Sequence, residues 1–192
     1  MPRATAADAA ETARRILEVA GEHFVAYGYT AASVDEIARA ADVTRGAVYH
    51  HYASKLGLFT SVVTQMQQEV AQAVVDAATD AGPLDALKRG SHAFVEAITT
   101  GGRARVVLVD APAALGWEAW RRMDAEASGV HLQDALVGIG VPDAARAATA
   151  ALLNGAMNEA ALWLAERPDD HDARDAVHAA LDRMLDAVAS DI

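Results

Sequence analysis

The residues best suited to chemistry form one short run of hydrogen-bond donors in the N-terminal third of the chain. They are Thr44, Arg45, Tyr49, His50, His51 and Lys55. No acidic residue occurs from 43 to 68, although the whole chain holds 27 Asp and Glu residues. A donor-rich segment without acids suits a polyanion, and duplex DNA offers it both phosphate oxygens and base edges.

We expect these donors to have different tasks on DNA. Arg45 is the candidate for base readout, and His50 can serve either a base edge or a phosphate. Gly46 and Ala47 leave the start of the helix bare, so its backbone can approach the bases and Ala47 can meet a thymine methyl group. The phosphate oxygens, which fix position and not sequence, suit Tyr49 and Lys55.

The sequence around the donors predicts two short helices joined by a tight turn, which is the arrangement of a helix-turn-helix. Ser33 and Glu36 have the spacing of a capping box at the start of the first helix. Asp42 falls in the turn, where it is one of the few non-glycine residue types that tolerate a left-handed backbone. Thr44 is placed to cap the second helix, over 45–51, which would enter the major groove.

A helical hairpin that simply faces solvent would show the same spacing. The DNA interpretation therefore depends on the second helix being rich in donors and free of acids. Thr30 and Ser33, near the start of the first helix, are two further candidates for phosphate contact.

Residues 30–59 resemble the N-terminal DNA-binding domain of the tetracycline-repressor-like (TetR) family of bacterial regulators. The matching features are Ile37-Ala38, Val43-Thr44-Arg45-Gly46, Tyr49-His50-His51-Tyr52 and Ser54-Lys55 followed by Leu58. The chain departs from the family pattern at Asp42, where Gly is usual, and at Leu56-Gly57, where acids are common. Neither departure removes a donor. The resemblance implies a dimeric regulator.

The composition is that of a globular helical protein. The chain has 192 residues, 53% of them hydrophobic, and nearly half of these are Ala, which favours helix and close helix contacts. There is no cysteine, which excludes disulfides and thiolate sites. We expect residues 1–7 to be disordered. We also expect no signal peptide and no membrane span, and therefore a cytoplasmic protein.

The charge is unevenly distributed along the chain. The formal net charge is −11. Residues 1–58 hold six Lys or Arg and seven acids, whereas residues 59–192 hold ten and twenty. An acidic C-terminal part beside a near-neutral donor patch would help such a protein to reject non-specific DNA.

Apolar residues at helical spacing, interrupted by Gly and Pro, predict an all-α chain of about nine helices. Besides the two of the helix-turn-helix, we expect helices over 8–27, 54–79, 84–99, 103–109, 115–128, 143–166 and 172–189. Gly28 and Pro112 are expected to end two of them, and the helix from 115 is a candidate to continue to 137. The run Val-Val-Leu-Val over 106–109 also fits a buried strand, but no partner strand is evident.

The last two expected helices are candidates for a dimer interface. The helix over 143–166 is apolar over more than half of its circumference, so it should bury one face against something other than its own core. We expect a four-helix interface across a two-fold axis. Its candidate residues are Leu152, Ala156, Trp163, Val177, Leu181, Met184 and Val188.

The C-terminal part also holds candidates for an apolar ligand pocket with few polar groups. They are Phe94, Ile98, Leu108, Trp117, Trp120, Met123, Asn154, Met157 and Asn158. Plain core packing would explain each of them singly.

The sequence does not favour an enzyme. It has no His-Glu-x-x-His, no Gly-rich phosphate loop and no Gly-x-Ser-x-Gly. Asp175 and His178 form a single pair, which favours a surface ion pair over a metal site. We expect no cofactor and no metal.

Together these features predict an all-α protein of two domains. Residues 1–53 would form an N-terminal three-helix DNA-binding domain, and residues 54–192 an antiparallel helical domain for dimerisation and ligand binding. The predicted function is a ligand-responsive transcription regulator, in the first place a repressor, that binds a palindromic operator in double-stranded DNA as a homodimer and is released by a small apolar effector. The alternative is a helical interaction module without DNA binding, which would explain the acidic body but not the donor-rich helix.

Overall fold

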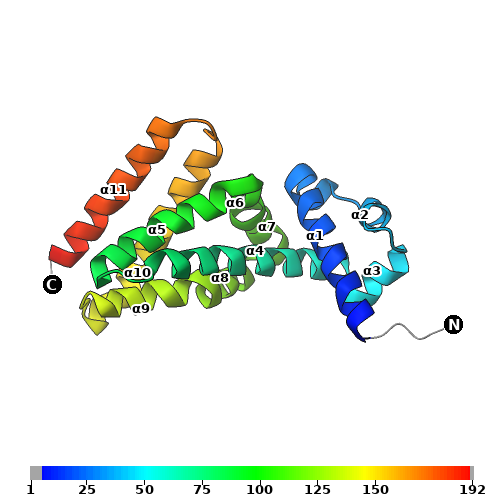
Figure 1. The fold of residues 1–192 in the computed structure, drawn as a ribbon, viewed down its shortest axis with the longest axis horizontal. Helices are drawn as coiled ribbons and strands as arrows, with labels where there is room; N and C mark the ends of the chain where they lie inside the picture. Colours follow the sequence, from blue (N-terminus) through cyan, green and yellow to red (C-terminus); the bar gives the residue numbers. More distant parts are fainter. Residues whose placement is uncertain (1–5, 191–192) are drawn as a thin grey trace.

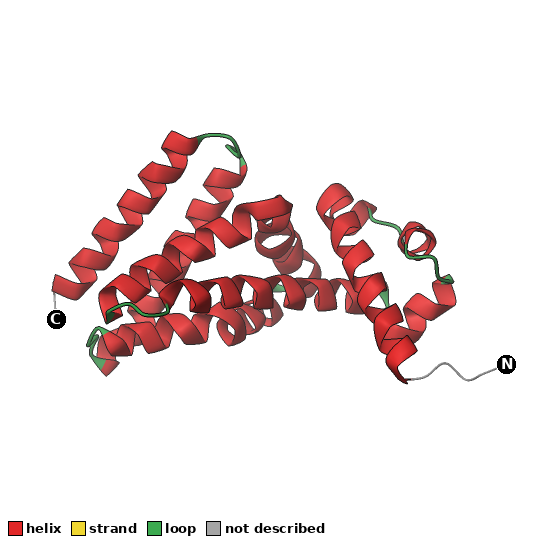
Figure 2. Ribbon diagram, viewed as in Figure 1, coloured by secondary structure: helices red, strands yellow, loops and turns green. Residues whose placement is uncertain are grey.

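The computed structural model describes residues 6–190, which form helices joined by turns with no strand among them (Figures 1 and 2). At one end lie α1 (Ala6–Ala31), α2 (Val34–Ala40) and α3 (Arg45–Tyr52). The long helix α4 (Lys55–Ala78) leads from this end into the rest of the molecule. No helix within the described residues is both long and apolar enough to cross a membrane.

The remaining helices form a bundle around the far part of α4 (Figure 1). In chain order they are α5 (Pro83–Thr99), a 3₁₀ turn (Thr100–Gly102), α6 (Arg103–Arg105), a π-helical segment (Val106–Asp110), α7 (Ala111–Leu115), α8 (Trp117–Asp124), a second π-helical segment (Ala125–Gly129), α9 (Val130–Gly138), α10 (Asp143–Ala165) and α11 (His171–Ser190). The helix α5 packs against α4 on one side and against α10 and α11 on others.

An aromatic cluster fixes the N-terminal helices to the start of α4. The rings of Phe24 and Phe59 meet edge to face with their centroids 4.9 Å apart, and the ring of Tyr29 lies 4.7 Å from that of Phe59. Phe24 and Phe59 are fully buried. Contacts of this kind between large buried rings add to the hydrophobic stabilisation, so α4 and the N-terminal helices share one core at this end.

The helix-turn-helix forms as the sequence predicted. The hydroxyl of Thr44 accepts a hydrogen bond from the backbone N–H of Ala47 at 3.1 Å, which caps α3. Asp42 adopts a left-handed backbone with φ 51°, and Val48 is buried beneath α3. The predicted capping box is wrong in its side-chain part, because Ser33 begins α2 without any side-chain cap hydrogen bond.

The helix boundaries differ from the prediction at three places. The helix α1 begins at Ala6, inside the segment expected to be disordered, and residues 1–5 lie outside the described residues. Gly28, with φ 74° and ψ 168°, breaks the helical path, but one more helical turn follows it to Ala31. Pro112 does not end its helix: it lies in the first turn of α7, directly after the π-helical segment, and the helix continues past it to Leu115.

Two alternatives left open by the sequence are settled by the structure. The run over 106–109 is helical, since it belongs to the π-helical segment Val106–Asp110. The chain from Trp117 continues through the second π-helical segment to Gly138, which confirms the longer of the two predicted extents.

Candidate nucleic-acid interface and cavity

The predicted DNA-contacting residues lie on and around the outer side of α3. Thr44, Arg45, Gly46 and His50 are exposed to differing degrees, and Ala47 and Tyr49 are also accessible. Thr30 is exposed at the end of α1, and Ser33 is half-buried at the start of α2. These side chains therefore lie at the surface of the protein.

Lys55 joins the far edge of this surface to the end of α1. Its Nζ donates to the backbone carbonyl of Thr30 at 3.1 Å and lies 4.8 Å from the centre of the Tyr29 ring. These contacts bring Lys55 and Thr30 together, although 25 positions separate them. The partly negative face of an aromatic ring attracts a cation, so this contact and the hydrogen bond fix the position of the Lys55 ammonium.

Arg45 is engaged by two neighbours within the helix-turn-helix. Its Nη1 lies 2.9 Å from Oδ2 of Asp35, and its Nη2 donates to the hydroxyl of Tyr49 at 3.2 Å. The hydrogen bond to Tyr49 and the charge of Asp35 both raise the pKa of Arg45. Asp35 was absent from the sequence-based set, because a contact ten residues away on another helix leaves no trace in helical spacing.

The C-terminal end of α3 faces the protein. His51 and Tyr52 are half-buried, and the hydroxyl of Tyr52 donates to the carbonyl of Ala13 in α1 at 2.7 Å. Burial raises the pKa of Tyr52. The exposed donors therefore lie between Arg45 and His50, while Tyr52 at the end of α3 contacts α1.

A second polar contact joins the N-terminal helices to the body. The backbone N–H of Tyr29 donates to Oδ2 of Asp110 at 3.1 Å, across 81 residues of sequence. Gly28 makes this approach possible, since a Cβ there would lie 2.6 Å from Nη2 of Arg105 and 3.1 Å from Oδ2 of Asp110. The sequence analysis assigned no role to Asp110. An acidic residue directly after the apolar run 106–109 could have been recognised there as a candidate for a polar contact.

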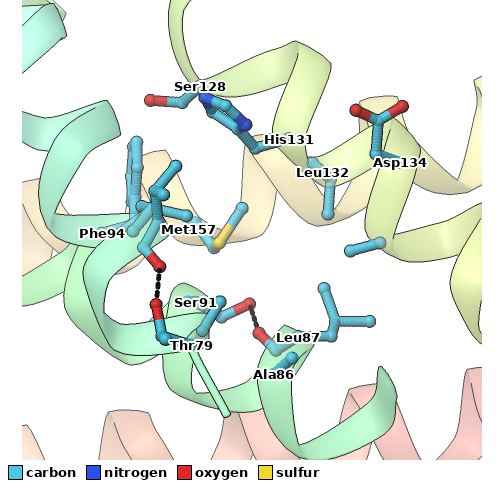
Figure 3. Close-up of a pocket in the computed structure, with 15 residues that line it drawn as sticks. Thr79, Ala86, Leu87, Ser91, Phe94, Ser128, His131, Leu132, Asp134 and Met157 are labelled. Carbon is cyan, nitrogen blue, oxygen red and sulfur yellow. Dashed lines mark hydrogen bonds between the residues drawn. The ribbon is translucent and has the colours of Figure 1, made fainter. Parts of the chain in front are cut away.

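A cavity of about 270 Å³ lies in the body among α4, α5, α9 and α10 (Figure 3). Most of its wall is apolar, from residues such as Val74, Leu87, Phe94, Leu132, Ala135 and Met157. The hydroxyls of Thr79 and Ser91 donate to backbone carbonyls of their own helices. Ser128, His131 and Asp134 line the cavity (Figure 3), and their side chains have no hydrogen bond or ion pair with any described residue.

The cavity differs from the predicted pocket in most of its residues. Phe94 and Met157 line it. The other seven predicted residues do not line it. Ile98, Leu108 and Trp120 are buried elsewhere, and Met123 and Asn158 also lie outside its wall. Trp117 is 62% exposed, and the side chain of Asn154 donates a hydrogen bond to Asp124. Helical spacing identifies which residues turn inward, but it does not show which inward faces leave a gap between them.

Asp124 is a buried acid that was not predicted to have a role. Nδ2 of Asn154 donates to Oδ2 of Asp124 at 2.7 Å, which joins α8 to α10. Burial raises the pKa of Asp124, and the hydrogen bond from Asn154 and the nearby Arg121 oppose this effect. The Asn154 side chain thus stabilises a carboxyl group that has little access to water.

A layer of polar side chains lies between α11 and α5. The rings of His92 and His178 stack with centroids 4.2 Å apart. His92 pairs with Asp182 at 2.9 Å, and His178 pairs with Glu96 at 3.2 Å and not with Asp175 as predicted. Burial and the neighbouring His92 lower the pKa of His178.

The candidate dimer residues are of three kinds. Leu152, Trp163 and Met184 are exposed, with Leu152 at 74%, and Ala156, Val177 and Val188 are partly buried. Leu181 is 4% exposed and belongs to the chain's own core, so its placement at the interface is corrected. It lies in the middle of α11, which packs against α5.

Comparison with known proteins places the chain among bacterial regulators. The family model described as "Bacterial regulatory proteins, tetR family" matches residues 16–62. The one described as "Tetracyclin repressor-like, C-terminal domain" matches residues 84–188, which is more than half of the chain.

Individual relatives match mainly through the N-terminal part. The transcriptional regulator SrpR of Pseudomonas putida is 51% identical over 67 residues, which cover 35% of this chain and 32% of SrpR. The transcriptional repressor BepR of Brucella suis is 36% identical over 107 residues, which cover 55% of this chain and 51% of BepR. The chain therefore spans about a third to a half of these curated relatives.

A solved structure matches over nearly the whole length. A TetR-family transcriptional regulator from Pectobacterium atrosepticum aligns with a TM-score of 0.70 and 28% identity, over 96% of this chain and 95% of that one. The order of the helices and their arrangement are therefore those of a known fold.

Proposed function

The chain belongs to the TetR family of bacterial transcriptional regulators, and we propose that it is a repressor that binds a palindromic operator as a homodimer and leaves it when a small effector fills the cavity. Membership in this family of DNA-binding regulators also means that the chain is not an enzyme. We place its site of action in the cytoplasm, where the operator DNA is.

The observation that carries the proposal is the exposed first part of α3. Thr44 caps the helix, Val48 anchors it to the core, and Arg45, Tyr49 and His50 project from it without an acid in the same helix. An α-helix presented in this way fits the major groove, with Arg45 as the base reader and Lys55 and Thr30 at the phosphates.

We propose residues 1–53 as the DNA-binding domain and residues 54–192 as the domain for dimerisation and ligand binding. The exposed apolar residues Leu152, Trp163 and Met184 on α10 and α11 support a second copy as their cover. In a two-fold dimer, two recognition helices about 34–36 Å apart would meet consecutive major grooves, which requires a palindromic operator.

The proposed effector is a small and largely apolar molecule. The cavity of about 270 Å³ is mostly lined by carbon, and Ser128, His131 and Asp134 offer it a few polar groups. No Lys or Arg is among the described residues that line it, whereas Asp134 is, which favours a neutral or cationic effector over an anionic one.

The helix α4 supports coupling between the cavity and the DNA. Its last turns contribute Val74, Val75 and Ala78 to the cavity wall, and its first turn begins at Lys55 beside α3. An effector that favours one position of α4 would change the spacing of the two recognition helices. A coupling free energy of about 1–3 kcal/mol would weaken DNA binding roughly 5- to 150-fold.

The proposal is tested by selecting duplexes from random sequence with the purified protein and measuring binding at two salt concentrations. A palindromic selected site and a steep loss of affinity with salt would support it. The second candidate function, a helical interaction module without DNA binding, would be favoured if no duplex were retained at low salt.

A further inference from the structure

The guanidinium of Arg45 is held at two points before any DNA is bound. Nη1 lies 2.9 Å from Oδ2 and 3.2 Å from Oδ1 of Asp35, and Nη2 lies 3.2 Å from the hydroxyl of Tyr49. The guanidinium carbon also lies 5.3 Å from the centre of the Tyr49 ring. The side chains of Arg45 and Asp35 are 57% and 54% exposed, so these contacts form at the surface where a duplex would dock.

Asp35 is an acidic residue on a surface that we propose contacts DNA phosphates, where a negative charge is unexpected. It lies in the first turn of α2, where the helix dipole favours a carboxylate. Near a duplex its negative charge repels the phosphate backbone, so it weakens DNA binding in general. Its neighbour Glu36 is also exposed and carries the same charge, but its side chain has no hydrogen-bond or ion-pair partner within residues 6–190.

We propose that Asp35 is a positioning residue for sequence readout: it holds the guanidinium of Arg45 in the orientation that reads one base pair and withholds it from phosphates at other sites. The proposal rests on the proposed function, in which Arg45 contacts a base. It adds a residue of α2 to the determinants of specificity, through its effect on a side chain of α3.

The guanidinium of Arg45 has enough N–H groups to contact Asp35 and a base edge at the same time. A guanidinium has five N–H groups. Nη1 donates to both carboxylate oxygens of Asp35 and Nη2 to the hydroxyl of Tyr49, so at least two N–H groups remain for a base edge. A free arginine side chain can turn to any nearby phosphate oxygen. One that is tethered loses less conformational freedom when it meets the base for which it is oriented, and it must break the contact with Asp35 to follow a phosphate elsewhere.

The expected size of the effect follows from the kind of contact. Exposed ion pairs are worth little, and their upper range corresponds to about 5-fold in a binding constant. A dimer presents the contact twice. Removal of the Asp35 charge should therefore lower the ratio of operator affinity to non-specific affinity by about 5-fold, and by at most about 25-fold, since two independent 5-fold factors multiply.

The test uses the full-length protein and the variants Asp35→Asn, Glu36→Gln, Arg45→Ala and the double variant with Asp35→Asn and Arg45→Ala. Each is titrated against a duplex selected by the unaltered protein and against a scrambled duplex of the same length, at two salt concentrations. Asp35→Asn and Glu36→Gln each remove one negative charge, from adjacent positions. Glu36→Gln therefore controls for the general electrostatic repulsion between the protein and the DNA phosphates. Folding is checked by the thermal midpoint of each variant.

We expect Glu36→Gln to tighten binding to both duplexes by the same factor, and Asp35→Asn to tighten binding to the scrambled duplex much more than to the selected one. In the Arg45→Ala background, Asp35→Asn should act like Glu36→Gln. Equal effects of the two charge removals, or a loss of specificity that persists without Arg45, would overturn the proposal while leaving DNA binding intact. If the unaltered protein bound no duplex, the proposed function would fail first, and this inference with it.

Discussion

The hydrogen bond between Asp110 and Tyr29 can be tested by replacing Asp110 with Ala. This change removes the acceptor for the backbone N–H of Tyr29, which lies 3.1 Å from Oδ2 of Asp110. The Asp110 side chain is 16% exposed, so water cannot fully replace the missing oxygen. The change therefore breaks the hydrogen bond that joins the end of α1 to the body of the protein.

The size of the effect can be worked out from the parts. A hydrogen bond to a charged group contributes about 1.5–3 kcal/mol to stability. Ala favours helix more than Asp does, which offsets up to about 0.7 kcal/mol of the lost stability in a helical segment. The net loss should be about 1–2 kcal/mol. For a chain of this size each kcal/mol corresponds to roughly 2–4 °C, so the thermal midpoint should fall by about 2–8 °C.

The assay is thermal and urea unfolding, followed by circular dichroism at constant pH. Asp110→Asn is the matched control, since its amide oxygen can still accept the hydrogen bond from Tyr29, and we expect it to lose clearly less stability than the Ala variant. The same Ala variant should also bind operator DNA more weakly, because the N-terminal helices lose a fixed orientation. An Asp110→Ala protein as stable as the unaltered one would show that this hydrogen bond does not stabilise the fold. Equal losses for Ala and Asn would assign the effect to charge and not to the hydrogen bond.

Three further predictions concern other parts of the molecule. Lys55→Ala should weaken binding to all duplexes alike and lower the salt slope of log K by about one for each phosphate that Lys55 neutralises, measured by titration at several salt concentrations; an unchanged slope would remove Lys55 from the phosphates. Asp124→Asn should raise the free energy of unfolding at neutral pH by about 1 kcal/mol, because it removes a buried charge and keeps an acceptor for Asn154. Since burial raises the pKa of Asp124, the folded state binds the proton more tightly, and the gain should shrink as the pH falls through that raised pKa; a gain independent of pH would contradict this cause. Leu152→Asp should lower the apparent mass in sedimentation or light scattering at micromolar concentration without changing the helical signal, and a variant that stays dimeric would move the interface away from Leu152.

The helix-turn-helix could be predicted because its signals are local. A cap such as Thr44 acts within three residues, and a turn residue such as Asp42 acts on its own backbone, so both can be recognised in a single short segment. The long helix α4 was predicted over 54–79, which is within one residue of the observed Lys55–Ala78 at each end. These features need no knowledge of the rest of the fold.

The cavity and the joint between the N-terminal helices and the body could not be predicted in the same way. The cavity arises where α4, α5, α9 and α10 fail to fill the space between them, which depends on how each helix is rotated. Trp117 illustrates the limit: its type suggested a pocket, but it lies exposed beside Trp120 at a ring distance of 4.9 Å. The hydrogen bond between Asp110 and Tyr29 joins positions 81 residues apart, and no periodicity connects them.

The difference between local signals and the packing of distant segments also explains the correction at Leu181. Its spacing with Val177 and Val188 marks one apolar stripe on α11, but the sequence does not show whether that stripe meets the chain's own core or a second copy. The structure assigns Leu181 to the core, through the packing of α11 on α5. Exposed Leu152 and Trp163 on α10 thereby become the main support for the proposed dimer.

In the proposed function, two copies of the chain present α3 together to one face of a duplex. The most direct measurement is the stoichiometry and salt dependence of binding to a selected duplex, by fluorescence anisotropy combined with the mass of the complex. We predict two chains per palindromic duplex, and an affinity that falls by several powers of ten between low and physiological salt if about six or more phosphates are contacted. A single chain per duplex, or no binding at low ionic strength, would contradict the proposed function.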